Sequence, residues 1–87
     1  MPKIKSRETI LDGKTIVMRI RHALLEQDMT QRELAPLLGV APNTLSSRMQ
    51  RPDRLTLAEL RRLCKVLHIE PGCLLGLDQD ISKQEAR

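Results

Sequence analysis

The 87-residue chain is long enough for one small domain. Hydrophobic residues make up 40% of it, but Phe, Tyr and Trp are absent, so the core must be aliphatic. This composition excludes the aromatic platforms on which RNA-recognition sheets and single-strand-binding proteins stack bases. No apolar run approaches the roughly 18 residues of a membrane helix, and the N-terminus has no signal-peptide core. We therefore expect a soluble, cytoplasmic protein.

Positive charge is concentrated in the first part of the chain. The formal net charge is +4, from 15 Lys and Arg against 11 Asp and Glu. Residues 1–54 contain 10 basic and 6 acidic side chains, whereas residues 55–87 contain 5 of each. A locally basic surface suits a polyanion such as DNA, although an ordinary solvated surface can also carry this charge.

The N-terminal half of the chain predicts an arm followed by a helix. Residues 1–12 are expected to form the arm, which is basic at its start and carries a few apolar residues. An amphipathic helix is predicted over residues 13–27, because apolar side chains recur at helical spacing at Ile16, Val17, Ile20, Ala23 and Leu24. His22 falls on the polar face, which predicts an exposed residue without a special role.

Two short helices are predicted next, separated by a glycine. Thr30 and Glu33 have the spacing of a capping box, and Leu34, Ala35 and Leu38 supply the buried face of the helix that follows. Gly39 is expected to end this helix, because the terminating residue needs a positive φ. A third helix is predicted over residues 41–49, with Pro42 at its first turn and with Leu45 and Met49 pointing the same way.

The C-terminal part predicts a loop, two helices and a tail. After a loop at residues 50–54, Thr56 and Glu59 form a second capping box. The helix that follows carries an apolar stripe, Leu57, Leu60, Leu63, Cys64 and Leu67, while Arg61, Arg62 and Lys65 face water. A short fifth helix is expected from Pro71, with Cys73, Leu74 and Leu75 inward and Gly76 as its stop. We therefore predict an all-α domain of five helices over residues 13–77, followed by a polar tail over 78–87.

The sequence offers no convincing metal site or catalytic centre. Cys64, His68 and Cys73 can be drawn as three zinc ligands, but the fourth is missing, and both cysteines are better explained as reduced small hydrophobes. Ser46, His22, Asp12 and Cys64 lack a context that activates a nucleophile, and no Gly-rich phosphate loop is present. We expect no enzyme activity, no cofactor and no bound metal.

The most informative stretch runs from Thr30 to Met49. Ala35 is small enough for two helices to cross closely, Gly39 allows a left-handed turn, and Val40 and Leu45 hold the second of these helices on the core. This arrangement projects the N-terminal end of a helix outward, as a reader of the DNA major groove requires.

The sequence resembles the phage-repressor and Cro type of helix-turn-helix protein, also called the XRE family. The resemblance is carried by residues 29–35, then Gly39 and Val40, then residues 44–46, and it continues in the leucines of the last two helices. It covers roughly residues 16–77. It implies a five-helix, lambda-repressor-like domain whose second and third helices form the helix-turn-helix.

The resemblance also implies a function and its residues. Proteins of this family bind double-stranded operator DNA, often as homodimers on palindromic sites, which makes this chain a sequence-specific transcriptional regulator, with repression the expected role. The helix at residues 41–49 would lie in the major groove, with base contacts expected from Ala41, Pro42, Asn43, Ser46 and Ser47. Asn43 has the strongest chemistry, because its amide can pair with adenine N6 and N7. Phosphate contacts are expected from Gln31, Thr44, Arg48, Arg51 and Arg54.

Four departures from the family pattern bear on these expectations. Pro36 falls in the second turn of its helix, where it removes a hydrogen bond and should kink the helix at a cost of about 3 kcal/mol. Ala41 lacks the hydroxyl that usually caps the recognition helix. Arg48 occupies a usually apolar position, from which it can reach toward the DNA backbone. Leu24 and Met49 replace an arginine and a glutamate that often form a buried ion pair, and we expect these two side chains to touch.

Explanations that involve no DNA contact are also open for several of these residues. Asn43 and Ser47 can be ordinary polar residues on a solvated face, and Arg51 and Arg54 can be simple loop charges. The whole domain can also be a protein-interaction module with little DNA binding, such as an antirepressor or an antitoxin. In either case we expect no membrane association and no small-molecule effector domain, since one small domain accounts for most of the chain.

Overall fold

The computed structural model describes residues 11–77, and every regular element in that range is a helix. In chain order these are α2 (Gly13–Glu26), α3 (Gln31–Leu38), α4 (Pro42–Gln50), the 3-10 helix η1 (Pro52–Arg54), α5 (Leu57–Leu67) and α6 (Pro71–Leu74). The prediction of an all-α fold with five α-helices is confirmed. Residues 1–10 of the predicted arm and the whole predicted tail at 78–87 lie outside the described residues.

The starts of three helices follow hydrogen-bonding signals in the sequence. Thr30 Oγ1 accepts from the Glu33 amide at 3.0 Å, and the Glu33 carboxylate accepts from the Thr30 amide at 2.9 Å. Thr56 and Glu59 repeat this capping box at the start of α5, at 3.1 and 3.0 Å. Asp12, at the end of the predicted arm, caps α2 by accepting from the Thr15 amide at 3.2 Å. These caps satisfy backbone donors that the first turn of a helix otherwise leaves without a partner.

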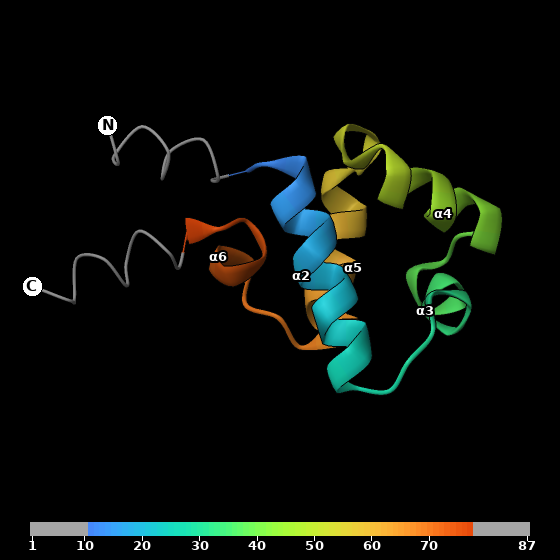
Figure 1. The fold of residues 1–87 in the computed structure, drawn as a ribbon. Coiled ribbons are helices and arrows are strands. Elements are labelled where there is room, and N and C mark those ends of the chain that lie inside the picture. The colour runs from blue at the N-terminus through green and yellow to red at the C-terminus, as the bar shows by residue number, and fades with distance from the viewer. Residues whose placement is uncertain (1–10, 78–87) are drawn as a thin grey trace, which may run out of the picture.

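The core is aliphatic, as the composition requires. Helices α2 and α5 form the centre of the domain, with α3 and α4 on one side of them and α6 on the other (Figure 1). The deepest side chains come from all five α-helices: Ile20, Leu34, Leu38, Leu45, Leu63, Leu67 and Leu74. These residues fix the position of α4 relative to the rest of the domain.

The predicted apolar stripe of α5 is confirmed in part. Leu63 and Leu67 are fully buried, and Leu60 and Cys64 are half-buried against the core. The prediction is wrong for Leu57, whose side chain is 66% exposed. A helix turns by about 100° per residue, so Leu57 lies roughly 100° around the axis from Leu63 and Leu67. The stripe is therefore too wide for all of it to face the core.

The segment predicted as a loop at residues 50–54 contains the single-turn helix η1, which packs against the start of α2. The contact is closest at Gly13, where a Cβ would lie 2.5 Å from Pro52 Cγ. Real Cβ atoms do not approach carbon this closely, and a proline ring has little freedom to move away. Gly13 is therefore required by the close approach of η1.

We expect Gly13→Ala to lower the melting temperature by several degrees, because the added methyl group overpacks this contact at a cost of about 1 kcal/mol or more. Gly72→Ala is the matched control, since its Cβ would make an ordinary 3.9 Å contact with Leu77 Cβ. That control should leave the melting temperature unchanged or raise it slightly. Thermal unfolding followed by circular dichroism measures both melting temperatures. Equal melting temperatures for the two variants would contradict the requirement for glycine at position 13.

No helix within residues 11–77 is long and apolar enough to cross a membrane.

Candidate nucleic-acid interface

A tight turn joins α3 to α4. Gly39 has a φ of +78°, which is the left-handed region that glycine adopts without a steric penalty. The amides of Gly39 and Val40 donate to the carbonyls of Pro36 and Ala35, each at 3.1 Å. The Ala35 side chain is completely buried, which is consistent with the predicted need for a small residue where the helices cross. The helix-turn-helix predicted from Thr30 to Met49 is therefore present in the structure.

An arginine from α5 supports this turn. Arg62 Nη1 donates a hydrogen bond to the carbonyl of Leu38 at 2.9 Å, and it lies 3.4 Å from the position of a Cβ on Gly39. A cation here also faces the negative end of the α3 dipole. Arg62 was expected only to face water. It is exposed, as predicted, but the periodicity of α5 carried no signal for this long-range contact.

Helix α4 is anchored on one side and open on the other. Leu45 and Met49 are only 1% and 4% exposed and hold α4 on the core. Asn43 and Ser47 are exposed on the opposite face, and Ser46 between them is half-buried. Ala41 and Pro42 are exposed at the N-terminal end of the helix. The structure thus places four of the five predicted base-contact residues on the exposed face or at the N-terminal end of one helix, with Ser46 half-buried beside them.

The N-terminal end of α4 has no side-chain cap. Ala41 occupies the capping position and makes no side-chain hydrogen bond, which confirms the expected departure from the family pattern. Pro42 follows it and has no N–H group to satisfy. The amides of Asn43 and Thr44 therefore receive no capping bond from Ala41, and the helix dipole adds a partial positive charge at this end.

The predicted phosphate-contact residues lie on α4 itself and on the elements next to it. Gln31 is the first residue of α3 and is half-buried, as is Thr44 in the first turn of α4. Arg51 follows the last residue of α4 and Arg54 ends η1, and both side chains are exposed. Arg51 and Arg54 therefore lie beyond the C-terminal end of α4, whereas Asn43 lies in its first turn.

Arg48, the remaining phosphate candidate, forms an ion pair inside the domain. Its Nε donates to Glu59 Oε1 at 3.1 Å, and the two side chains are 27% and 10% exposed. The pair joins α4 to α5. From the sequence, Arg48 is a charged residue at a usually apolar position, and it was expected to reach toward the DNA backbone. Glu59 was assigned only to its own capping box, so the pairing was missed.

The environment of Glu59 lowers its pKa. Burial of the carboxyl acts in the opposite direction and is the largest single influence, because it disfavours the charged form. The hydrogen bond from the Thr56 amide and the hydrogen bond and positive charge of Arg48 together outweigh that effect. Glu59 is therefore held as a carboxylate between the start of α5 and the side of α4.

Two further departures can be located in the structure. Leu24 and Met49 are 7% and 4% exposed and belong to the same core cluster, so both replacements are buried as apolar residues. A direct contact between them remains a prediction. Helix α3 continues through Pro36, which is exposed, so the helix does not end there. The predicted kink at Pro36 remains untested.

The other polar groups considered in the sequence do not form a site in the described part of the chain. His22 is exposed, as predicted, with Nε2 lying 3.2 Å from the Glu26 carboxylate. Cys64 and Cys73 are free and half-buried, and burial raises the pKa of the Cys64 thiol. Within residues 11–77, no cluster of three or more His, Cys, Asp or Glu could hold a metal ion.

Comparison with known proteins agrees with this geometry. Residues 19–80 match the family model of the Cro/C1-type helix-turn-helix DNA-binding domain, a range that covers α3, the turn, α4, α5, α6 and the second part of α2. No curated protein and no solved structure gave a significant match. The family match spans well over half of the chain. The chain therefore belongs to the Cro/C1-type helix-turn-helix DNA-binding family.

Proposed function

We propose that the protein is a sequence-specific transcriptional regulator, acting as a repressor, that inserts α4 into the major groove of double-stranded DNA. The observation that carries this proposal is the asymmetry of α4. Leu45 and Met49 fix the helix on the core, while its outer face carries only small and polar side chains. A helix presented in this way fits the width of the major groove.

The outer face of α4 offers several kinds of base contact. The Asn43 amide can pair bidentately with adenine, and the hydroxyls of Ser46 and Ser47 can reach bases or phosphates. Ala41 and Pro42 can make apolar contact with a thymine methyl group. The uncapped amides of Asn43 and Thr44 at the positive end of the helix add potential phosphate donors.

Phosphate contacts would set the position of the domain on DNA. We assign this role to Gln31 and Thr44, and to the exposed arginines Arg51 and Arg54. Arg48 is a weaker candidate than the sequence suggested, because its Nε already donates to Glu59. We also propose binding as a homodimer to a palindromic site. Leu74 of the last helix is 1% exposed and closes the core, so it is not available for a dimer contact.

Selection from a random pool of duplex DNA with the purified protein tests this function directly. A regulator should enrich one motif, and two inverted half-sites would support the dimer. Affinity for that motif should fall steeply as salt rises, because phosphate contacts release counterions. An antirepressor or antitoxin with the same fold would enrich no motif and would show weak binding at low salt. We expect no catalytic activity in either case.

Two substitutions separate base reading from backbone binding. Asn43→Ala should cost about 1–3 kcal/mol on the selected site and should relax the preference at one base pair only. Arg51→Ala should weaken binding to all sequences alike and reduce the slope of affinity against salt by about one. Titrations on the selected site and on single-base variants measure both effects. Equal losses on every sequence for Asn43→Ala would remove Asn43 from the base-reading residues.

A further inference from the structure

An open pocket lies where the N-terminal part of α2 meets the C-terminal end of α4 and η1. Its volume is about 360 Å³. Its apolar part includes Met18 of α2, Met49 of α4 and Pro52 of η1. None of the residues predicted to contact DNA lines this pocket, so it is a separate feature of the surface.

Two cations flank the apolar part of the pocket. Lys14 and Arg21 line it from α2, and Met18 lies between them at a spacing of four and three residues, which places all three on one face of the helix. All three side chains are exposed. Within residues 11–77, neither cation forms an ion pair or a hydrogen bond, and no acidic side chain lines the pocket. A ligand that fits this pocket should therefore be anionic and partly apolar.

Gln50 connects the pocket to the outer face of α4. It is the last residue of this helix, it is exposed, and its side chain lines the pocket. Asn43, Ser47 and Gln50 follow one another at a spacing of four and three residues, so they lie along one side of α4. The helix face that is proposed to enter the major groove therefore leads directly to the pocket.

We propose that this pocket binds the sugar-phosphate backbone of DNA beside the major groove that α4 enters, with Lys14 and Arg21 each neutralising a phosphate. This inference rests on the proposed function of α4. A backbone strand fits the pocket because it alternates phosphates with apolar sugar carbons, and the pocket places Met18 between two cations. Seven residues of helix rise about 10 Å, and the long Lys and Arg side chains can adjust to the spacing of phosphates along one strand.

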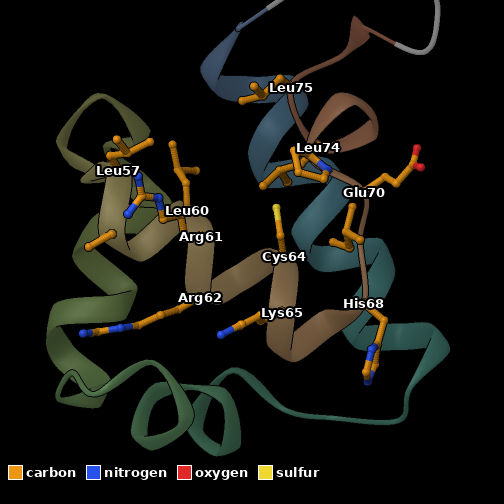
Figure 2. A pocket seen from close by; sticks show the side chains of 13 residues that line it. Leu57, Leu60, Arg61, Arg62, Cys64, Lys65, His68, Glu70, Leu74 and Leu75 are labelled. Carbon is orange, nitrogen blue, oxygen red and sulfur yellow. The ribbon is translucent and has the colours of Figure 1, made fainter.

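A larger apolar groove lies between α5 and α6, on the side of the domain away from α4 (Figures 1 and 2). Arg61 and Lys65 also place cations along it, but Glu70 lines it too, and no residue of α4 takes part. Nothing described connects this groove to the recognition helix. Arg61 and Lys65 therefore serve as charge-matched controls for Lys14 and Arg21.

Removal of the two cations tests the proposal on the selected DNA motif. Each phosphate contact contributes about 0.9 to the slope of log affinity against log salt concentration. Lys14→Gln with Arg21→Gln should therefore reduce this slope by about two and weaken binding to all sequences alike. The preferred motif should not change, because backbone contacts carry no direct sequence information. Arg61→Gln with Lys65→Gln removes the same charge and should leave the slope nearly unchanged.

Two substitutions of Met18 separate the effect of charge from the effect of folding. Met18 is 57% exposed, so a charged side chain at this position should not disturb the core. Met18→Arg should strengthen binding and steepen the salt dependence by about one, because it adds a phosphate contact. Met18→Glu should weaken binding, because it places a carboxylate between the two cations that face the backbone. Opposite effects at equal melting temperatures cannot arise from unfolding.

Titrations of labelled duplex over a range of salt concentrations measure these effects. The proposal is overturned if the native chain binds its motif and the Lys14 and Arg21 double variant keeps the native slope. It is also overturned if the Arg61 and Lys65 control loses as much of the slope as that double variant. The proposed function survives both results. Absence of duplex binding by the native chain would overturn the proposed function and the role of the pocket together.

Discussion

Replacing Leu24 with arginine should destabilise the domain by about 3 to 5 kcal/mol, because it places a charge in the core without a partner. Leu24 is 7% exposed and lies in the same cluster as Met49. The family resemblance implies an arginine at this position, paired with a glutamate where this chain has Met49. The substitution therefore introduces only one member of an ion pair. The variant should be less stable than a domain with two apolar residues or with a complete ion pair at these positions.

Thermal and urea unfolding measure this effect. Met18→Arg is the matched control, since Met18 is on the same helix and is 57% exposed. It should change stability by less than about 0.5 kcal/mol. The double variant Leu24→Arg, Met49→Glu should recover much of the lost stability if the two positions are in contact. An unchanged melting temperature for Leu24→Arg would refute the burial argument, and no recovery in the double variant would refute the contact.

Features that depend on neighbours in the sequence were the ones predicted best. The two capping boxes, the glycine turn at Gly39 and the buried faces of α2 and α3 each follow from residues a few positions apart. The helices themselves were predicted from periodicity and capping signals, and the family resemblance added the expectation that Asn43 and its neighbours face outward from α4.

Features that depend on distant residues were missed. The bond from Arg62 to the Leu38 carbonyl joins residues 24 positions apart, and helix periodicity contains no information about it. Leu57 was assigned to the core because periodicity shows which residues share a face, but not how much of that face a neighbour covers. Arg48 was assigned to a DNA phosphate, and its pairing with Glu59 was missed because Glu59 already had a local explanation in the capping box.

The pair formed by Arg48 and Glu59 should therefore be a major source of stability at neutral pH. Arg48→Met keeps most of the side-chain volume but leaves the Glu59 carboxylate, which is 10% exposed, without its cation. We expect a loss of about 2 kcal/mol at pH 7, the size of a hydrogen bond to a charged group. Glu33→Gln is the control for disturbing a capping box alone, because Glu33 forms the equivalent box on an exposed surface. Glu33→Gln should lower the free energy of unfolding by less than Arg48→Met does.

The pH dependence of this loss distinguishes an ion pair from simple packing. The folded state lowers the pKa of Glu59, so its contribution to stability is fully present above the ordinary pKa of about 4.5. That contribution disappears as the pH falls through the lowered value, because the carboxyl takes up a proton and the pair is lost. The difference in unfolding free energy between the native chain and Arg48→Met should therefore shrink from pH 7 to pH 3. A difference that stays constant over this range would show that Arg48 acts through packing, and it would leave Arg48 free to bind phosphate.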